Sequence, residues 1–203
     1  MGNIDYSNGN NCLDLIFDNY SVDNQNRYAV FDLVLVEAKK YSDPLHYLAC
    51  AYACHYSRST YRPQAIVFFE KYLVNPVSPK NQTLTLSRVY SDLAEDYEGE
   101  YEFEKASKGY QKAISLQDRR YYSSVTGQYA INPIEVKLGR LFLKMGTQYA
   151  IDYWKFLMGC PEYEKGDPEQ SGFRRSVDLE YKNALDKHNR GYVYKPRKNR
   201  IPK

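Results

Sequence analysis

The sequence has few of the residues that most often build catalytic or metal sites. Its 203 residues include 4 Cys, 3 His and 1 Trp. We find no glycine-rich phosphate loop, no Gly-x-Ser-x-Gly motif and no His-Glu-x-x-His motif. The spacing of Cys12, Cys50, Cys54 and Cys160 is not that of a disulfide framework. These absences argue against a P-loop enzyme, a serine hydrolase or a zinc protease, and we expect neither enzymatic activity nor a cofactor.

Long apolar runs are also missing. No stretch approaches the 18 apolar residues that a membrane span needs. The first residues, Met-Gly-Asn-Ile-Asp-Tyr, contain no basic segment followed by an apolar one, so no secretory signal is visible. We therefore expect a cytoplasmic protein that does not bind membranes.

What the chain does contain is apolar and tyrosine-rich. Hydrophobic residues make up 43% of it, and 22 residues are Tyr. Tyrosine combines a large contact area with a hydroxyl that needs a polar partner, which suits a groove or a seam between helices. Residues 1–118 carry 16 acidic and 11 basic side chains, whereas residues 119–203 carry 9 and 17. This asymmetry indicates either differently charged ends, an internal acidic–basic contact, or solvated faces followed by a basic tail.

The most informative pattern lies in residues 87–118. An aromatic, a leucine, a small residue and a second aromatic share one helical face, and an Ala–Tyr–Ala series follows after a break at Gly99. The members are Tyr90, Leu93, Ala94 and Tyr97, then Ala106, Tyr110 and Ala113. This spacing predicts a helical hairpin with small residues where the two backbones approach.

The pattern resembles a tetratricopeptide (TPR) repeat, a 34-residue helix–turn–helix unit. A similar series occupies residues 43–76, and a degenerate one, with Glu135 in place of the first aromatic, occupies 132–158. The motif leucines Leu48, Leu93 and Leu138 are each 45 residues apart, so insertions separate the hairpins. One such hairpin cannot bury its apolar face alone, so the resemblance implies a stacked array that binds rather than catalyses.

We therefore predict an all-α fold, since no pair of strands is visible. The resemblance implies a right-handed α-α superhelix of about three TPR-like hairpins (about 43–76, 84–118 and 132–158) with flanking helices. We expect residues 1–26 to be mobile or loosely docked, and 27–190 to form a single domain. That domain begins with a helix at 28–41 and closes with a capping helix at about 172–189. A basic tail follows at 191–203.

The resemblance also implies which side chains face a concave groove, because the leading helices of TPR arrays line it. The positions that match are His46, Cys50, Ala53 and Cys54; Arg88, Ser91, Asp92, Glu95, Glu98 and Gly99; and Val136, Lys137, Arg140, Leu143 and Lys144. The middle helix is acidic, which favours a protein or peptide ligand with a basic segment. Alternatively, Glu95 and Arg140 pair with each other, which would contribute only ~0–1 kcal/mol if exposed.

Two clusters invite a metal hypothesis. His46, Cys50 and Cys54 are spaced i, i+4 and i+8, so two of them can share a zinc ion but the third is displaced by ~12 Å. Small cysteines at helix contacts explain them better. The carboxylates of residues 95–104 lie across a predicted turn and lack the spacing of a calcium loop. We expect no metal site.

An alternative function uses the basic C-terminal third, which would make the protein nucleic-acid-associated or regulatory. Basic side chains alternate there with Tyr192 and Tyr194, offering charge and stacking faces to nucleic acid. They are Arg190, Lys195, Arg197, Lys198 and Arg200. Exposed tyrosine surfaces are also compatible with a homodimer. A non-catalytic protein- or peptide-binding scaffold remains the function that the sequence favours.

Overall fold

The computed structural model describes residues 4–20, 27–57, 59–81, 83–117, 120–123, 128–160, 163 and 172–195. The chain divides into two compact units, residues 1–116 and 117–203. This division differs from the single domain expected over 27–190. Both units consist mainly of helices, as predicted.

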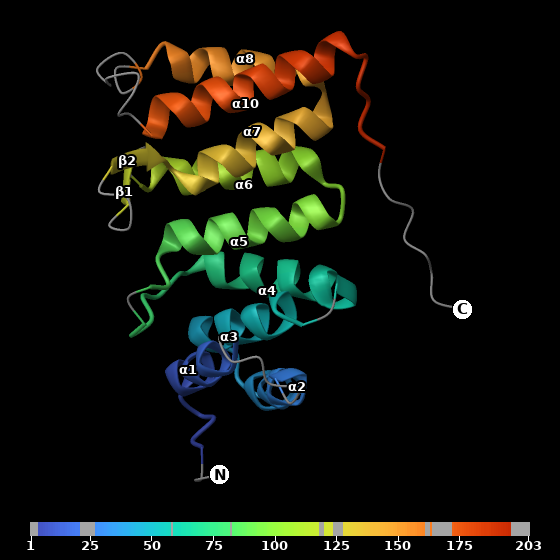
Figure 1. Cartoon of the computed structure of the whole chain (residues 1–203). Coiled ribbons are helices and arrows are strands. Elements are labelled where there is room, and N and C mark those ends of the chain that lie inside the picture. Colours follow the sequence, from blue (N-terminus) through green and yellow to red (C-terminus); the bar gives the residue numbers. More distant parts are fainter. Residues whose placement is uncertain are drawn as a thin grey trace. The chain divides into compact units, whose positions relative to one another are not determined.

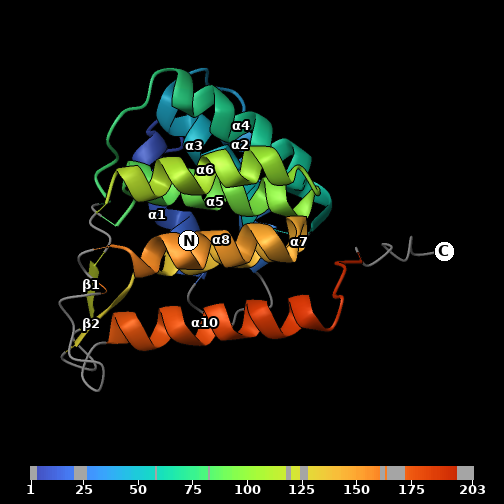
Figure 2. The ribbon, with the colours of Figure 1, turned by 90° about the horizontal axis from the view of Figure 1, so that it is seen from above.

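The part of unit 1 that the structure describes forms six α-helices and one short 3-10 helix. They are α1 (Gly9–Tyr20), α2 (Arg27–Ala38), α3 (Pro44–His55), η1 (Ser59–Tyr61), α4 (Arg62–Val74), α5 (Leu86–Gly99) and α6 (Phe103–Ser115). Neighbouring helices pack in pairs, α1 with α2, α3 with α4 and α5 with α6. Figure 1 shows α3, α4 and α5 stacked in chain order, and Figure 2 shows α5 and α6 side by side. The hairpins predicted at 43–76 and 84–118 are thus present as helix pairs.

The leading helices begin where side chains can satisfy their first N–H groups. Asp43 accepts from the backbone N–H groups of Leu45 and His46, and Pro44 occupies the first turn of α3. Thr85 accepts from the backbone N–H of Arg88 at the start of α5. The first residues of α3 and α5 can therefore be predicted from neighbouring residues in the sequence.

Helix α3 is the buried centre of unit 1. Every residue from 48 to 54 is buried, because α1, α2 and α4 all pack against it. Helix α1 contributes Cys12, Leu13 and Ile16 to this interior. The expectation of a mobile or loosely docked start is therefore wrong for residues 9–20. Residues 21–26 lie outside the described part of the chain.

The described residues of unit 2 form three helices and a small hairpin of strands. The helices are α7 (Pro133–Met145), α8 (Thr147–Met158) and α10 (Gly172–Asn189), and the strands are β1 (Arg120–Ser123) and β2 (Gln128–Ile131). The strands pair antiparallel, with Arg120 opposite Ile131. We did not expect strands, since four-residue segments held by backbone hydrogen bonds leave almost no periodic signal in the sequence. The α7–α8 hairpin and the helix at 172–189 match the predicted elements.

In unit 2, α10 packs along α8 and also contacts β2. Phe173, Val177 and Ala184 of α10 join Trp154 and Leu157 of α8 in one apolar core. Helix α10 therefore buries one stripe of its surface, and its capping role in a repeat array stays a prediction. In the basic tail, the described residues end at Lys195, and Arg197, Lys198 and Arg200 lie outside them.

The superhelical arrangement of the hairpins stays a prediction.

Within the described ranges, no helix has the length and apolarity to cross a membrane.

Candidate functional site

The predicted groove positions on α3 are buried. His46 and Cys50 are each about 1% exposed, and Cys54 is equally covered. Helices α1 and α2 both pack against α3, and the carbonyl oxygen of Tyr6, just before α1, lies 2.9 Å from His46 Nε2. His46 and Cys50 therefore do not line an open groove in this structure. The prediction failed there because it treated residues 1–26 as mobile or only loosely docked.

On α5 the predicted residues divide into two groups. Ser91 and Asp92 are buried, whereas Arg88, Glu95 and Glu98 are half-buried. Arg88, Asp92 and Glu95 are spaced i, i+4 and i+7, so they follow one face of the helix. Part of this face remains accessible to a ligand.

The predicted residues of α7 belong to unit 2. Val136 and Lys144 are half-buried, and Arg140 is exposed. The Arg140 guanidinium pairs with Glu180 of α10 at 2.8 Å. Since α5 and α7 belong to different units, a groove shared by both helices stays a prediction.

The accessible face of α5 is part of a larger cluster in unit 1, which we call the aromatic–acidic cluster. It joins side chains of α1, α3, α5 and the residue that follows α3. Its members are Phe17, Tyr20, Tyr52, His55, Tyr56, Arg88, Asp92 and Asp96. Sequence reasoning placed only Arg88 and Asp92 at a site, because helical spacing does not show which helices face each other.

The outer layer of this cluster is aromatic and cationic. Tyr20 is 48% exposed, and its ring stacks on that of Tyr56 with centroids 4.0 Å apart. Arg88 donates from Nη2 to the Tyr56 hydroxyl at 3.0 Å. The same guanidinium lies 5.3 Å from the centre of the Phe17 ring, within the range of a cation–π interaction. Since the Arg88 side chain is 36% exposed, this layer presents both π faces and N–H donors to solvent.

The inner layer is a set of buried hydrogen bonds between α3 and α5. The Tyr52 hydroxyl donates to Asp92 Oδ2 at 3.0 Å, and His55 Nδ1 lies 2.9 Å from Asp96 Oδ2. Burial lowers the pKa of His55, but the hydrogen bond and charge of Asp96 outweigh it, so the pKa is raised overall. Burial raises the pKa of Asp92 despite the nearby positive groups. The inner layer thus ties α3 to α5 and fixes the outer layer above it.

Two further tyrosines bond to carboxylates across helix pairs. The Tyr97 hydroxyl of α5 donates to Glu70 of α4, and the Tyr110 hydroxyl of α6 donates to Glu98 Oε2. Burial, helped by these carboxylates, raises the pKa of both phenols. Glu98 therefore contributes to hairpin packing as well as to the acidic surface.

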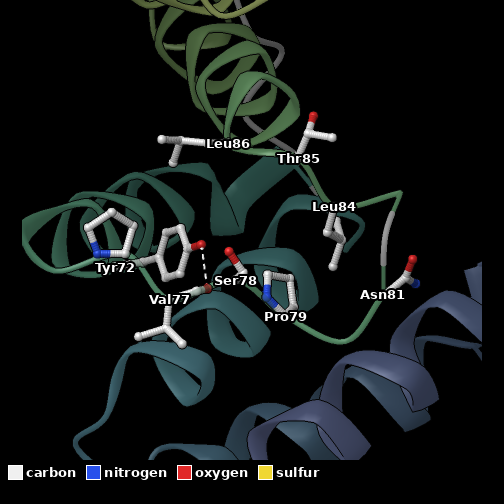
Figure 3. Close-up of a pocket in the computed structure, with 9 residues that line it drawn as sticks. Tyr72, Val77, Ser78, Pro79, Asn81, Leu84, Thr85 and Leu86 are labelled. Carbon is white, nitrogen blue, oxygen red and sulfur yellow. Dashed lines mark hydrogen bonds between the residues drawn. The ribbon is translucent and has the colours of Figure 1, made fainter.

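A separate pocket of about 370 Å³ lies beside the loop from α4 to α5 (Figure 3). The Tyr72 hydroxyl donates to the carbonyl oxygen of Val77 at 2.9 Å and closes one side. The wall is formed by Tyr72, Pro76, Val77, Ser78, Pro79, Asn81, Leu84, Thr85 and Leu86. No Asp, Glu, Lys, Arg or His is among these residues, so the wall itself offers no charged acid or base.

The cysteines are poor candidates for nucleophiles or metal ligands. Burial raises the pKa of Cys50 and Cys54 to about 12, and that of Cys12 to about 11. At neutral pH all three are thiols, whereas thiolates are the reactive and metal-binding form. In the part of the chain that the structure describes, no group of three or more His, Cys, Asp or Glu residues is placed to hold a metal ion.

No protein-family model, curated protein or solved structure matches the chain in sequence or structure comparisons.

Proposed function

We propose that the protein is a non-catalytic, TPR-like scaffold that binds a protein or peptide. The packed helical hairpins agree with the repeat pattern of the sequence. The observation that carries the proposal is the outer layer of the aromatic–acidic cluster. Tyrosine and arginine dominate the binding energy of many protein interfaces, because they combine large contact areas with directed hydrogen bonds.

The charged side chains on the accessible face of α5 indicate which groups a ligand would carry. Arg88 supplies donors at one end of the accessible stripe and Glu95 supplies an acceptor two turns away. A segment with a basic residue near Glu95 and an acceptor near Arg88 would match this order. Glu98 adds negative charge one turn further along.

The proposal is tested by the double variant Tyr20→Ala/Glu95→Lys. Partners are captured from the native cell, identified by mass spectrometry and then titrated in purified form. The matched control is Tyr149→Ala/Glu104→Lys, which changes an exposed tyrosine of α8 and an exposed glutamate of α6. We expect the first variant to bind its partner at least about tenfold more weakly, equivalent to ~1.4 kcal/mol, with unchanged helical circular dichroism.

A partner lost equally from both variants would not use this face. Retention of every partner by Tyr20→Ala/Glu95→Lys would refute the proposal.

The alternative is nucleic-acid binding by the basic C-terminal third. In the described part of that region, Arg190 pairs with Asp186 at 3.1 Å and Lys187 lies 5.2 Å from the Tyr192 ring. The Arg190–Asp186 pair is exposed to solvent, and a pair of this kind contributes only ~0–1 kcal/mol, so it does not prevent contact with phosphate. Filter binding over a salt series separates the two, because phosphate contacts weaken steeply as salt rises.

A further inference from the structure

The pocket beside the α4–α5 loop has no part in the proposed scaffold function. Its loop has eleven residues, 75–85, between Val74 and Leu86, and residue 82 of it lies outside the described part of the chain. Connections between packed helices usually have about two to eight residues, and longer ones are commonly functional or disordered. By contrast, three residues, 100–102, join α5 to α6. In arrays of helical hairpins, insertions of this kind often lie on the binding face.

Hydrogen bonds hold this loop in one conformation. The Tyr72 hydroxyl donates to the carbonyl oxygen of Val77 at 2.9 Å. The backbone N–H of Lys80 donates to Asn10 Oδ1 of α1 at 2.8 Å. Asn81 accepts three more hydrogen bonds within the same loop. The pocket is therefore formed before a ligand arrives, which lowers the entropic cost of binding.

Most of the pocket wall is apolar. Its volume of about 370 Å³ is in the range of small-molecule sites. The apolar part consists of the Tyr72 ring and the side chains of Pro76, Val77, Pro79, Leu84 and Leu86. These rings and branched side chains can pack against the faces of a flat apolar group.

The polar part of the wall consists of Ser78, Asn81 and Thr85. Asn81 Oδ1 and Thr85 Oγ1 already accept backbone hydrogen bonds, so the amide and the hydroxyl offer their N–H and O–H groups as donors. The Ser78 hydroxyl makes no hydrogen bond to any described residue, and Figure 3 shows it between the rings of Tyr72 and Pro79. The wall thus offers donors to an acceptor on the ligand.

We propose that this pocket binds a small neutral molecule that combines an apolar ring with a carbonyl or amide group. The ring packs against Tyr72, Pro79 and Leu84, and the oxygen accepts from the Ser78 hydroxyl. An ionised ligand would lose hydration without gaining a charged partner, because the wall contains no Asp, Glu, Lys, Arg or His. This binding does not depend on the proposed capture of a protein by the aromatic–acidic cluster.

Three probes of nearly equal size and shape test the preference for a neutral ligand. Benzamide is neutral, benzoate is an anion and benzamidinium is a cation. Each is titrated to about 50 mM into the full chain labelled with nitrogen-15, at neutral pH and constant ionic strength, and the amide chemical shifts are followed by NMR. We expect benzamide to shift the amide signals of Ser78, Leu84 and Leu86 with a Kd on the order of 1–10 mM, as its small size allows. Benzoate and benzamidinium should bind at least about tenfold more weakly.

Two substitutions of Ser78 assign the binding to this pocket. Ser78→Phe fills the space between the rings and should abolish the shifts caused by benzamide. The matched control is Ser115→Phe, which changes an exposed serine at the end of α6, outside the pocket wall, and should bind benzamide like the wild type. Ser78→Ala removes only the hydroxyl and should weaken benzamide binding about 2- to 10-fold. Ser78 is itself exposed, so we expect unchanged helical circular dichroism in both variants.

The proposal is overturned if benzamide causes no saturable shift of the loop amides, or if the three probes bind equally well. Unchanged binding of benzamide to Ser78→Phe also overturns it. If Ser78→Phe does not fold, Ser78→Ala decides, and a wild-type affinity for benzamide in that variant overturns the proposal.

Discussion

At the scale of single residues, the closest helix crossings depend on side chains that are very small. Gly139 of α7 faces the indole of Trp154 on α8, where a methyl group would lie 2.1 Å from Cζ2. Trp154 is itself almost fully buried and cannot move into solvent. The glycine at this repeat position is thus required by the tryptophan opposite.

Replacing this glycine should strain the unit 2 core. We expect Gly139→Ala to lower the free energy of unfolding by about 1–3 kcal/mol, the usual cost of overpacking, measured by urea denaturation. The matched control is Gly159→Ala, where the nearest atom to the new methyl group is 3.6 Å away. Equal stability of the two variants would show that the α7–α8 crossing is looser than described.

At the scale of elements, α1 is a helix that local composition did not predict. Its Asn- and Asp-rich composition is typical of turns, yet Cys12, Leu13 and Ile16 share one face and are buried. Burial of that face against α3 and α2 overrides the weak local propensity, since packing supplies most helical stability in proteins.

This packing predicts a large effect from a substitution in α1. Ile16→Ala should lower the free energy of unfolding by about 2–5 kcal/mol, because it removes a fully buried side chain. Asp14→Ala, an exposed position of the same helix, should have little effect. Chemical denaturation of both variants measures the difference, and a small loss for Ile16→Ala would mean that α1 is only loosely docked.

At the scale of the whole molecule, the chain is built from two units that each contain their own buried residues. In unit 1 the interior surrounds α3, and in unit 2 it surrounds Trp154. The boundary after Leu116 follows the end of α6.

Fragments should therefore fold according to this boundary. We expect residues 1–116, expressed alone, to give helical circular dichroism and one cooperative melting transition. A fragment that ends at residue 81 lacks α5 and α6 and should melt without a cooperative transition. In that fragment Tyr52, His55 and Glu70 lose their hydrogen-bond partners on α5, which are Asp92, Asp96 and Tyr97. A 1–116 fragment that melts gradually would show that unit 1 needs unit 2 to fold.

Much of the helical organisation was predictable because its signals are local. The Asp43–Pro44 and Asn132–Pro133 starts and the spacing of Leu93, Ala94 and Tyr97 depend on residues within one or two turns of each other. The resulting helices, α3 to α8 and α10, lie close to where the pattern predicted them.

The site was less predictable, because accessibility is decided by segments far apart in the chain. The spacing of residues in the sequence was enough to predict which positions share a helical face, including Arg88, Asp92 and Glu95. Helical periodicity did not reveal that α1 packs over the start of α3, where His46 lies. It also did not reveal that Asp92 is buried and bonded to Tyr52, or that Arg88 reaches Phe17. The physical reason is that helical periodicity specifies a face, whereas the element that buries or exposes this face is chosen by packing between distant segments.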